Sequence, residues 1–421
     1  MPAPLLDLIV VSCLAGALAI ALAHPRGRWE ALVALGASAV VIGTGVISIR
    51  EATDQVRLLL PVVGFLVAIL VVADACAAAG LFRALGALVR RHRGDGPRPL
   101  VLLSFIAAAV VTAVLSLDAT VVLLTPVIAA ATIGTTAHRA GVHANVRLAN
   151  SASLLLPVSN LTNLLALPHL GISFTTWLLL MAPVWLAVLA VEYAGMVLVF
   201  SEVRRGGASG SVGVVAAVRL PRFPLLAVAV MLVGFAAGSP LGIDPVWVAA
   251  GAAMVLVLHG THAGTLDTRR VLDAAHLPFA LFVLGLGVVV LGVTDSFLGS
   301  LVAALVPHGK GLPTLLLIAL LATLLANVVN NLPATLLLVP LVAPLGPAYV
   351  LAALIGLNVG SGLTLPGSLA NLLWRRTLLR HGLTADLRLF HRHAILVTPV
   401  AVLAGVLVLW MMTGIPGLLH A

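Results

Sequence analysis

The sequence predicts an all-α polytopic membrane protein with about ten transmembrane helices and two re-entrant hairpins. Three observations carry this prediction. Of the 421 residues, 61% are hydrophobic and 9% are charged, whereas a soluble domain carries about 25% charged residues. Apolar stretches recur from end to end, each long enough to cross about 30 Å of hydrocarbon. Backbone polar groups in lipid must be bonded within their own segment, so these stretches are expected to be helices.

Ten segments have the length and hydropathy of full spans. They are residues 4–23, 29–49, 57–80, 148–170, 174–200, 223–240, 245–260, 276–298, 348–373 and 394–412. The first is interpreted as a span and not as a signal peptide, because it contains Asp7 and no Lys or Arg precedes it.

Two further apolar stretches, 99–136 and 312–346, are too long for one span. Each is interrupted by polar residues, "LSLDAT" in the first and "NVVNNLPAT" in the second. A short helix, a polar tip and a second short helix form a re-entrant hairpin. Its exposed backbone is tolerated only where it lines a cavity buried within the protein.

The basic residues divide unevenly between the two sides of this topology. One side receives only Arg50, Arg57 and Lys310. The other receives Arg26, Arg28, Arg83, Arg90, Arg91, Arg93, Arg98, Arg139, Arg147, Arg204, Arg205, Arg219, Arg222, Arg269, Arg270, Arg375, Arg376, Arg380, Arg388 and Arg392. The richer side is expected to be cytoplasmic, which places both termini outside the cytoplasm.

The two halves of the chain, 1–210 and 211–421, resemble each other. The segment "NSASLLLPVSNLTNLL" (150–165) aligns with "NVGSGLTLPGSLANLL" (358–373) at an offset of 208, and seven of the 16 positions are identical. Each half holds five spans and a hairpin. Since five is odd, the second half is expected to enter the membrane in the opposite orientation, which is the inverted-repeat plan of secondary transporters.

The aligned polar segments predict two broken helices at mid-membrane, unwound around Ser159–Asn160 and Gly367–Ser368. Pro157 and Pro366 each remove a backbone donor, and Gly367 loosens the chain. We expect the freed carbonyls and amide side chains to face the hairpin tips and bind a small polar solute or cation. Helix-to-helix packing by the same polar groups is the alternative. The candidate binding residues are Ser116, Asp118, Thr120, Asn150, Ser153, Ser159, Asn160, Asn163, Asn330, Asn331, Thr335, Asn358, Ser361, Ser368 and Asn371.

Ionisable residues inside the membrane cost roughly 2.5–3.5 kcal/mol each on insertion scales, so each needs a partner or a function. Asp118 at the first tip is the leading candidate to carry a proton or cation; capping the helix at Ala119 is its alternative role. Glu192 is the second candidate for proton coupling, unless it pairs with another element. Asp74 and Asp295 are expected to be solvated or packing residues.

At these residues the chain resembles the ion transporter superfamily. "SLDATVVLLTP", "NSASLLLPVSNLTNLL", "ANVVNNLPATLLL" and "GSLANLLW" are most similar to ArsB-type arsenite efflux permeases, beside NhaD-type sodium/proton antiporters and divalent-anion/sodium symporters. The resemblance implies a rigid scaffold of spans 1–3 and 6–8. It also implies a mobile transport unit that moves as an elevator, often within a homodimer. Leu117 stands where the first tip of the family usually has Asn, so one polar ligand of a sodium site is missing there.

The resemblance implies a secondary active transporter of a bacterial inner membrane, with arsenite efflux as the main function and cation/proton antiport or anion symport as the alternative. Arsenite is mainly the neutral triol As(OH)₃ at neutral pH, which suits Asn, Ser and Thr. No Walker loop is present, so energy is expected from a proton gradient, the membrane potential or a separate ATPase subunit. No cofactor, metal site, nucleic-acid partner or enzymatic activity is expected.

Overall fold

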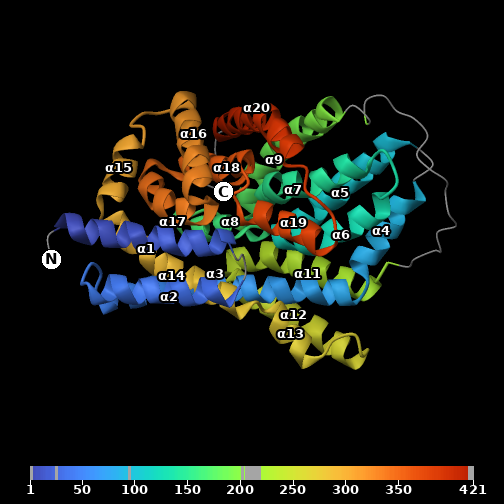
Figure 1. Cartoon of the computed structure of the whole chain (residues 1–421), viewed down its shortest axis with the longest axis horizontal. Coiled ribbons are helices and arrows are strands. Elements are labelled where there is room, and N and C mark those ends of the chain that lie inside the picture. Colours follow the sequence, from blue (N-terminus) through green and yellow to red (C-terminus); the bar gives the residue numbers. More distant parts are fainter. Residues whose placement is uncertain (1–2, 24–26, 93–95, 201–202, 204–219, 416–421) are drawn as a thin grey trace.

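The computed structural model describes residues 3–23, 27–92, 96–200, 203 and 220–415, and every regular element in them is helical. Nine helices in this part of the chain are long and apolar enough to cross a membrane. The prediction of a multi-span helical membrane protein is therefore confirmed (Figure 1). The basic residues Arg26, Arg93, Arg204, Arg205 and Arg219 lie outside the described residues.

The helices follow the predicted spans with shifted ends. The helices of the first half are α1 (Ala3–Ala23), α2 (Arg28–Gly43), α3 (Ile49–Ala78), α4 (Leu81–Arg91), α5 (Pro97–Val114), α6 (Thr125–Thr132), α7 (His138–Ser151), α8 (Leu161–Ala166) and α9 (Phe174–Val199). Those of the second half are α11 (Arg222–Gly238), α12 (Pro245–His262), α13 (Thr268–Ala274), α14 (Leu277–Thr294), α15 (Phe297–Leu305), α16 (Leu312–Val329), α17 (Asn331–Val342), α18 (Pro347–Asn358), α19 (Leu369–Arg380) and α20 (Leu387–Thr413).

The helices pack in two groups. Helices α1, α2, α3, α11, α12 and α14 contact one another and lie in the lower part of Figure 1. Helices α5, α7, α9 and α16 to α20 form the second group in the upper part. The groups meet where α3 contacts α8 and residues Ala119–Leu124, and where α14 contacts α17.

Both predicted hairpins are helix–turn–helix units with their turns at the expected polar tips. The first turns between α5 and a π-helical stretch, Ala119–Leu124, that leads into α6. The second turns at Asn330, whose φ of 73° permits an abrupt reversal between α16 and α17. The first arms are longer than expected, since α5 and α16 have 18 residues each and so reach roughly 27 Å.

The segments 148–170 and 348–373 are interrupted helices, as predicted. Helix α7 ends at Ser151 and α8 begins only at Leu161. Helix α18 ends at Asn358 and α19 begins at Leu369. We call residues 152–160 the first break and residues 359–368 the second break. Asn160 and Ser368 cap the helices that follow, accepting the backbone N–H groups of Thr162 (3.2 Å) and Ala370 (3.1 Å).

One assignment from the charge count was wrong. Arg147 was expected in a cytoplasmic loop, but α7 begins ten residues before the predicted span and carries Arg147 into the interior, with a side chain only 2% exposed. Hydropathy could not show this, because a charged residue lowers the score of the segment that contains it whether or not a partner neutralises its charge.

Candidate functional site

Both hairpin tips and both breaks line a single cavity at the junction of the two helix groups. Its polar lining comes from Ser116 and Asp118 of the first tip, Asn331 of the second tip, Ser159, Asn160 and Thr162 around the first break, and Ser368 of the second break. Its apolar wall comes from α3 and α14, through Phe65, Leu66, Ile69 and Phe279. The cavity has a volume of about 40 Å³, room for a few water-sized groups.

Asp118 is the one ionisable side chain among the described residues that line this cavity. It is 9% exposed. Its expected alternative role as a helix cap is not seen, because the side chain makes no capping bond. Ser116 supplies the cap instead, since its Oγ accepts the backbone N–H of Ala119 at 3.2 Å. The carboxyl group of Asp118 is therefore not used to start the helix.

Four asparagines behind the cavity form matched hydrogen bonds between the helices that flank the two breaks. Asn150 donates to Asn371 Oδ1 at 2.8 Å, and its counterpart Asn358 donates to Asn163 Oδ1 at 2.7 Å. Asn163 donates to the carbonyls of Ser153 and Leu156, and Asn371 donates to those of Ser361 and Thr364. Each of these bonds has an equivalent bond between residues shifted by 208 positions, so the repeated sequence forms a repeated set of hydrogen bonds.

The match is incomplete at one place. Asn358 Oδ1 accepts from Asn160 Nδ2 at 2.8 Å and from Thr162 Oγ1 at 2.6 Å. The counterparts of these donors are Ser368 and Ala370, and Asn150 Oδ1 has no hydrogen-bond partner among the described residues. The side-chain oxygen of Asn358 therefore has two donors from the first break and α8, whereas the equivalent oxygen of Asn150 has none from the second break and α19.

The candidate residues therefore separate into three sets. Ser116, Asp118, Ser159, Asn160, Asn331 and Ser368 line the cavity. Asn150, Ser153, Asn163, Asn358, Ser361 and Asn371 are buried behind it, and their side chains bond to the breaks or to the helices that flank them.

Three candidates form the third set, and their side chains do not line the central cavity. Thr120 Oγ1 lies 2.7 Å from Thr112 Oγ1, Asn330 donates to the carbonyl of Pro366 at 2.8 Å, and Thr335 donates to that of Asn331 at 2.7 Å.

The freed carbonyls of the breaks are largely bonded within the protein, in contrast to the expectation that they would face a solute. In the second break, Asn327 donates to Gly360, Asn371 to Ser361 and Thr364, and Asn330 to Pro366. In the first break, Trp185 and Trp177 donate to Ala152 and Leu154. Side chains therefore provide most of the polar lining available to a solute.

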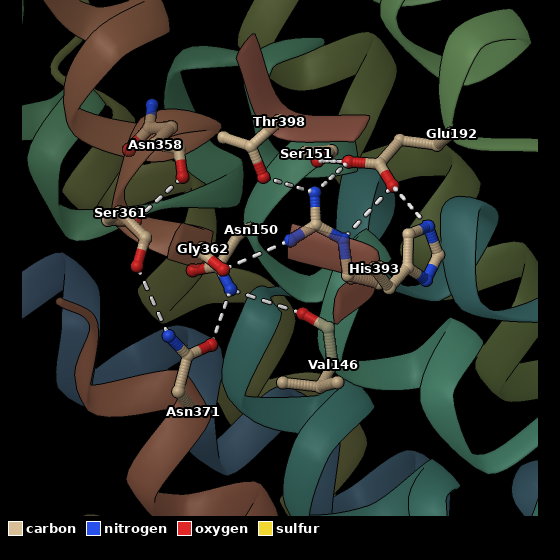
Figure 2. Close-up of polar contacts among 11 residues, drawn as sticks. Val146, Asn150, Ser151, Glu192, Asn358, Ser361, Gly362, Asn371, His393 and Thr398 are labelled. Carbon is tan, nitrogen blue, oxygen red and sulfur yellow. Dashed lines mark hydrogen bonds and ion pairs between the residues drawn. The ribbon is translucent and has the colours of Figure 1, made fainter. Parts of the chain in front are cut away.

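Glu192 pairs with another element, which was one of its two predicted roles. Its carboxylate accepts Nε and Nη2 of Arg147 at 3.1 and 2.7 Å and the hydroxyl of Ser151 at 2.6 Å (Figure 2). Glu192 is fully buried, and His393 Nε2 lies 3.8 Å from Oε2. Asp74 also has a partner, Arg270, at 2.7 Å, whereas Asp295 is exposed.

Further cavities lie on either side of the central one, along the same face of α3. One is lined by Gln55, Leu59 and Val62, and another, which shares Asp118 with the central cavity, by Leu70 and Asp74. Gln55 and Asp74 are 19 residues apart, or roughly 28 Å along a helix, close to the thickness of the hydrocarbon core. The row of cavities therefore follows the junction of the two helix groups over about that depth.

Sequence reasoning missed Thr162, Asn327 and Arg147. Thr162 lies inside the quoted repeat, but its counterpart is Ala370, so the alignment did not single it out. Asn327 stands in "NVVNN" and accepts the backbone N–H and the hydroxyl of Thr364 at 2.9 and 2.8 Å. Arg147 lies three residues before the repeated segment, too far from it to be grouped with the motif.

A helical fold with several spans and a polar cavity between broken helices defines the class of a membrane transporter. A family model described as "Citrate transporter" (CitMHS) matches residues 17–349, and the chain belongs to this family.

The chain is also similar to curated proteins named arsenical pump membrane protein. That of Yersinia enterocolitica is 26% identical over 405 residues, covering 90% of this chain and 93% of the relative. That of Escherichia coli strain K12 is 27% identical over 353 residues, covering 79% and 82%. The crystal structure of the Alcanivorax borkumensis YdaH transporter, described as having an unusual topology, shares the fold. Its TM-score is 0.58 at 18% identity, with 92% of this chain and 97% of that chain covered.

Proposed function

We propose that the protein is a secondary active transporter that exports arsenite or a similar neutral hydroxylated solute. The cavity formed by both tips and both breaks carries this proposal. Its lining offers hydroxyl, amide and carboxyl groups, which suit the three hydroxyls of As(OH)₃. The name of the arsenical pump relatives points in the same direction.

The electrostatics of the cavity favour a neutral or cationic solute over a dianion. A dianion calls for a fixed positive group. The buried guanidinium of Arg147 is already balanced by Glu192, and Asp118 would repel a negative solute. Sodium/proton antiport is the second candidate function, because Asp118 places a carboxylate against the cavity.

The proposed movement is that of an elevator. The group of α1, α2, α3, α11, α12 and α14 would be the scaffold, and the second group would carry the site past it. The cavities along α3 support this proposal, since they lie at the junction where such a movement would occur. The matched bonds of the asparagines support an inverted repeat of 1–210 and 211–421. A homodimer belongs to the same proposal, and so does energy from a proton gradient or the membrane potential, with a separate ATPase subunit as the alternative source.

Growth of an arsenite-sensitive, efflux-deficient bacterium tests this function. Expression of the protein should restore growth on arsenite and should leave growth on high sodium unchanged. The opposite pattern would replace arsenite efflux by sodium/proton antiport. Absence of any effect on arsenite with the protein present in the membrane would refute the main proposal.

The proposed topology predicts which residues share a side of the membrane. Single cysteines introduced at Arg83 and Arg139, both exposed, should react with an impermeant thiol reagent only from the cytoplasmic side. A cysteine at Lys310 should react only from outside. Labelling of Arg83 and Arg139 from opposite sides would mean that the first hairpin crosses the membrane.

Replacement of Asn331 by Ala should reduce arsenite flux at least tenfold, equivalent to about 1.4 kcal/mol. The side chain of Asn331 lines the cavity, whereas its bond to Gly367 is made by the backbone N–H and survives the change. Stability should stay close to that of the wild type, because Ala is favourable in a helix. Asn145→Ala is the matched control, since Asn145 is buried and bonds to its own helix at Gly141. Normal flux in Asn331→Ala would show that the residue only packs.

A further inference from the structure

The geometry points to Arg147 as a positioning residue that holds the second break in the shape required for binding. Arg147 lies on α7, just before the first break, yet its Nη1 donates to the carbonyl of Gly362 in the second break at 3.1 Å. The other two nitrogens of the guanidinium, Nε and Nη2, bond to Glu192 on α9. One side chain thus connects α7, the helix that leads into the first break, to the second break.

The guanidinium is held from several elements at once. Nε and Nη2 bind Glu192 of α9, and Nη2 also binds Thr398 Oγ1 of α20 at 2.9 Å. Because Glu192 balances its charge, the group can be buried beside the break without leaving a net charge there. Its planar fork of donors allows it to bind the carboxylate and the carbonyl together, which a lysine ammonium cannot match.

This restraint is present in only one of the two repeats. The counterpart of the Gly362 carbonyl is that of Leu154, which accepts the neutral indole N–H of Trp177 at 3.3 Å. The counterpart of Arg147 is Ile355, which is buried and apolar. A hydrogen bond from an ionised donor is roughly twice as strong as a neutral one, so the second break is held more firmly at this carbonyl than the first.

The restrained carbonyl stands close to groups that shape the cavity. Asn371 binds the carbonyls of Ser361 and Thr364 on either side of Gly362. The chain then continues to Ser368, which caps α19 and lines the cavity. A side chain at position 362 would disturb this arrangement, because a Cβ there would lie 2.9 Å from Arg147 Nη1. The Arg147 contact therefore sets where Ser368 stands in the cavity.

Two variants and a control test the inference, which rests on the proposed function only for its transported probe, arsenite. Arg147→Lys keeps a positive charge beside Glu192 but should lose the bond to Gly362. Gly362→Ala should push the guanidinium away without changing any charge. Thr398→Val removes a different partner of Arg147 and leaves the break untouched. Two quantities are measured: the KM and maximal rate of arsenite uptake in proteoliposomes, and hydrogen–deuterium exchange of the backbone amides within residues 361–368, where Pro366 has none.

We expect both Arg147→Lys and Gly362→Ala to raise KM at least tenfold and change the maximal rate less than twofold. Exchange over 361–368 should rise at least tenfold, and Thr398→Val should match the wild type in both measurements. The inference would be overturned if Arg147→Lys and Gly362→Ala had the KM and the exchange of the wild type. It would also be overturned if Thr398→Val changed both quantities as much as the two test variants do. If Arg147→Lys does not fold, Gly362→Ala decides. A wild-type protein that does not transport arsenite refutes the proposed function instead, and the exchange comparison alone then decides the role of Arg147.

Discussion

Replacement of Glu192 by Leu should lower the free energy of unfolding by about 3–5 kcal/mol, the usual cost of leaving one partner of a buried ion pair uncompensated. The side chains of Arg147 and Glu192 are 2% and 0% exposed. After the change, the guanidinium would keep only Thr398 and Gly362 as partners. Unfolding in mixed detergent micelles by SDS, followed by circular dichroism, measures this loss.

The double variant Arg147→Met/Glu192→Leu should recover most of the lost stability, because well-packed apolar side chains often replace a buried ion pair at little cost. The KM of the double variant for arsenite should nevertheless be higher than that of the wild type, because the carbonyl of Gly362 has lost its donor, Arg147. Arg139→Met is the control for the loss of a surface pair. Arg139 and Asp386 are 58% and 39% exposed, so the change should cost only about 0–1 kcal/mol. If Glu192→Leu were as stable as Arg139→Met, the buried pair of Arg147 and Glu192 would not stabilise the protein more than a surface pair does.

Replacement of Asp118 by Asn should give a protein that exchanges arsenite down its gradient but no longer responds to an imposed pH difference. Efflux against a gradient requires a titrating group that the transport unit can carry across. Asp118 lies between the central cavity and the adjoining cavity that Asp74 also lines, so a proton on it could reach either. The pH-driven part of uptake in proteoliposomes should fall at least tenfold.

Asp295→Asn is the matched control, because this carboxyl is exposed at the end of α14 and should leave the pH response unchanged. An intact pH response in Asp118→Asn would remove Asp118 from the coupling role. The same assay would then be applied to Glu192→Gln, the second candidate, whose carboxylate is bound to Arg147 and Ser151 in this structure.

Features that depend on a local stretch of chain could be predicted from the sequence. Hydropathy over about 20 residues identified the spans, because transfer into lipid depends on the composition of each segment itself. The tips and breaks were identified for the same reason, since Pro157, Pro366 and the clustered Asn and Ser residues disrupt a helix wherever it packs. The repeated asparagines were identified because they recur at a fixed offset.

Features that depend on which helices meet could not be predicted. Glu192 has its partner 45 residues away on α7, and hydropathy counted that partner as a loop residue. The sequence also could not show that Asn163 and Asn371 would bond to the breaks themselves, because the freed carbonyls of a break can bind either a solute or the protein.

The order of apolar and polar residues was enough to establish a helical membrane protein with two polar tips and two interrupted helices in a repeated order. The packing of the helices was needed to show which of these polar groups face a cavity, that α3 and α14 supply its apolar wall, and that Asp118 is the ionisable group among the described residues that line it. The physical reason is that burial in lipid is decided segment by segment, whereas a binding site depends on distances between side chains from different helices. Those distances are fixed only when the two helix groups pack together.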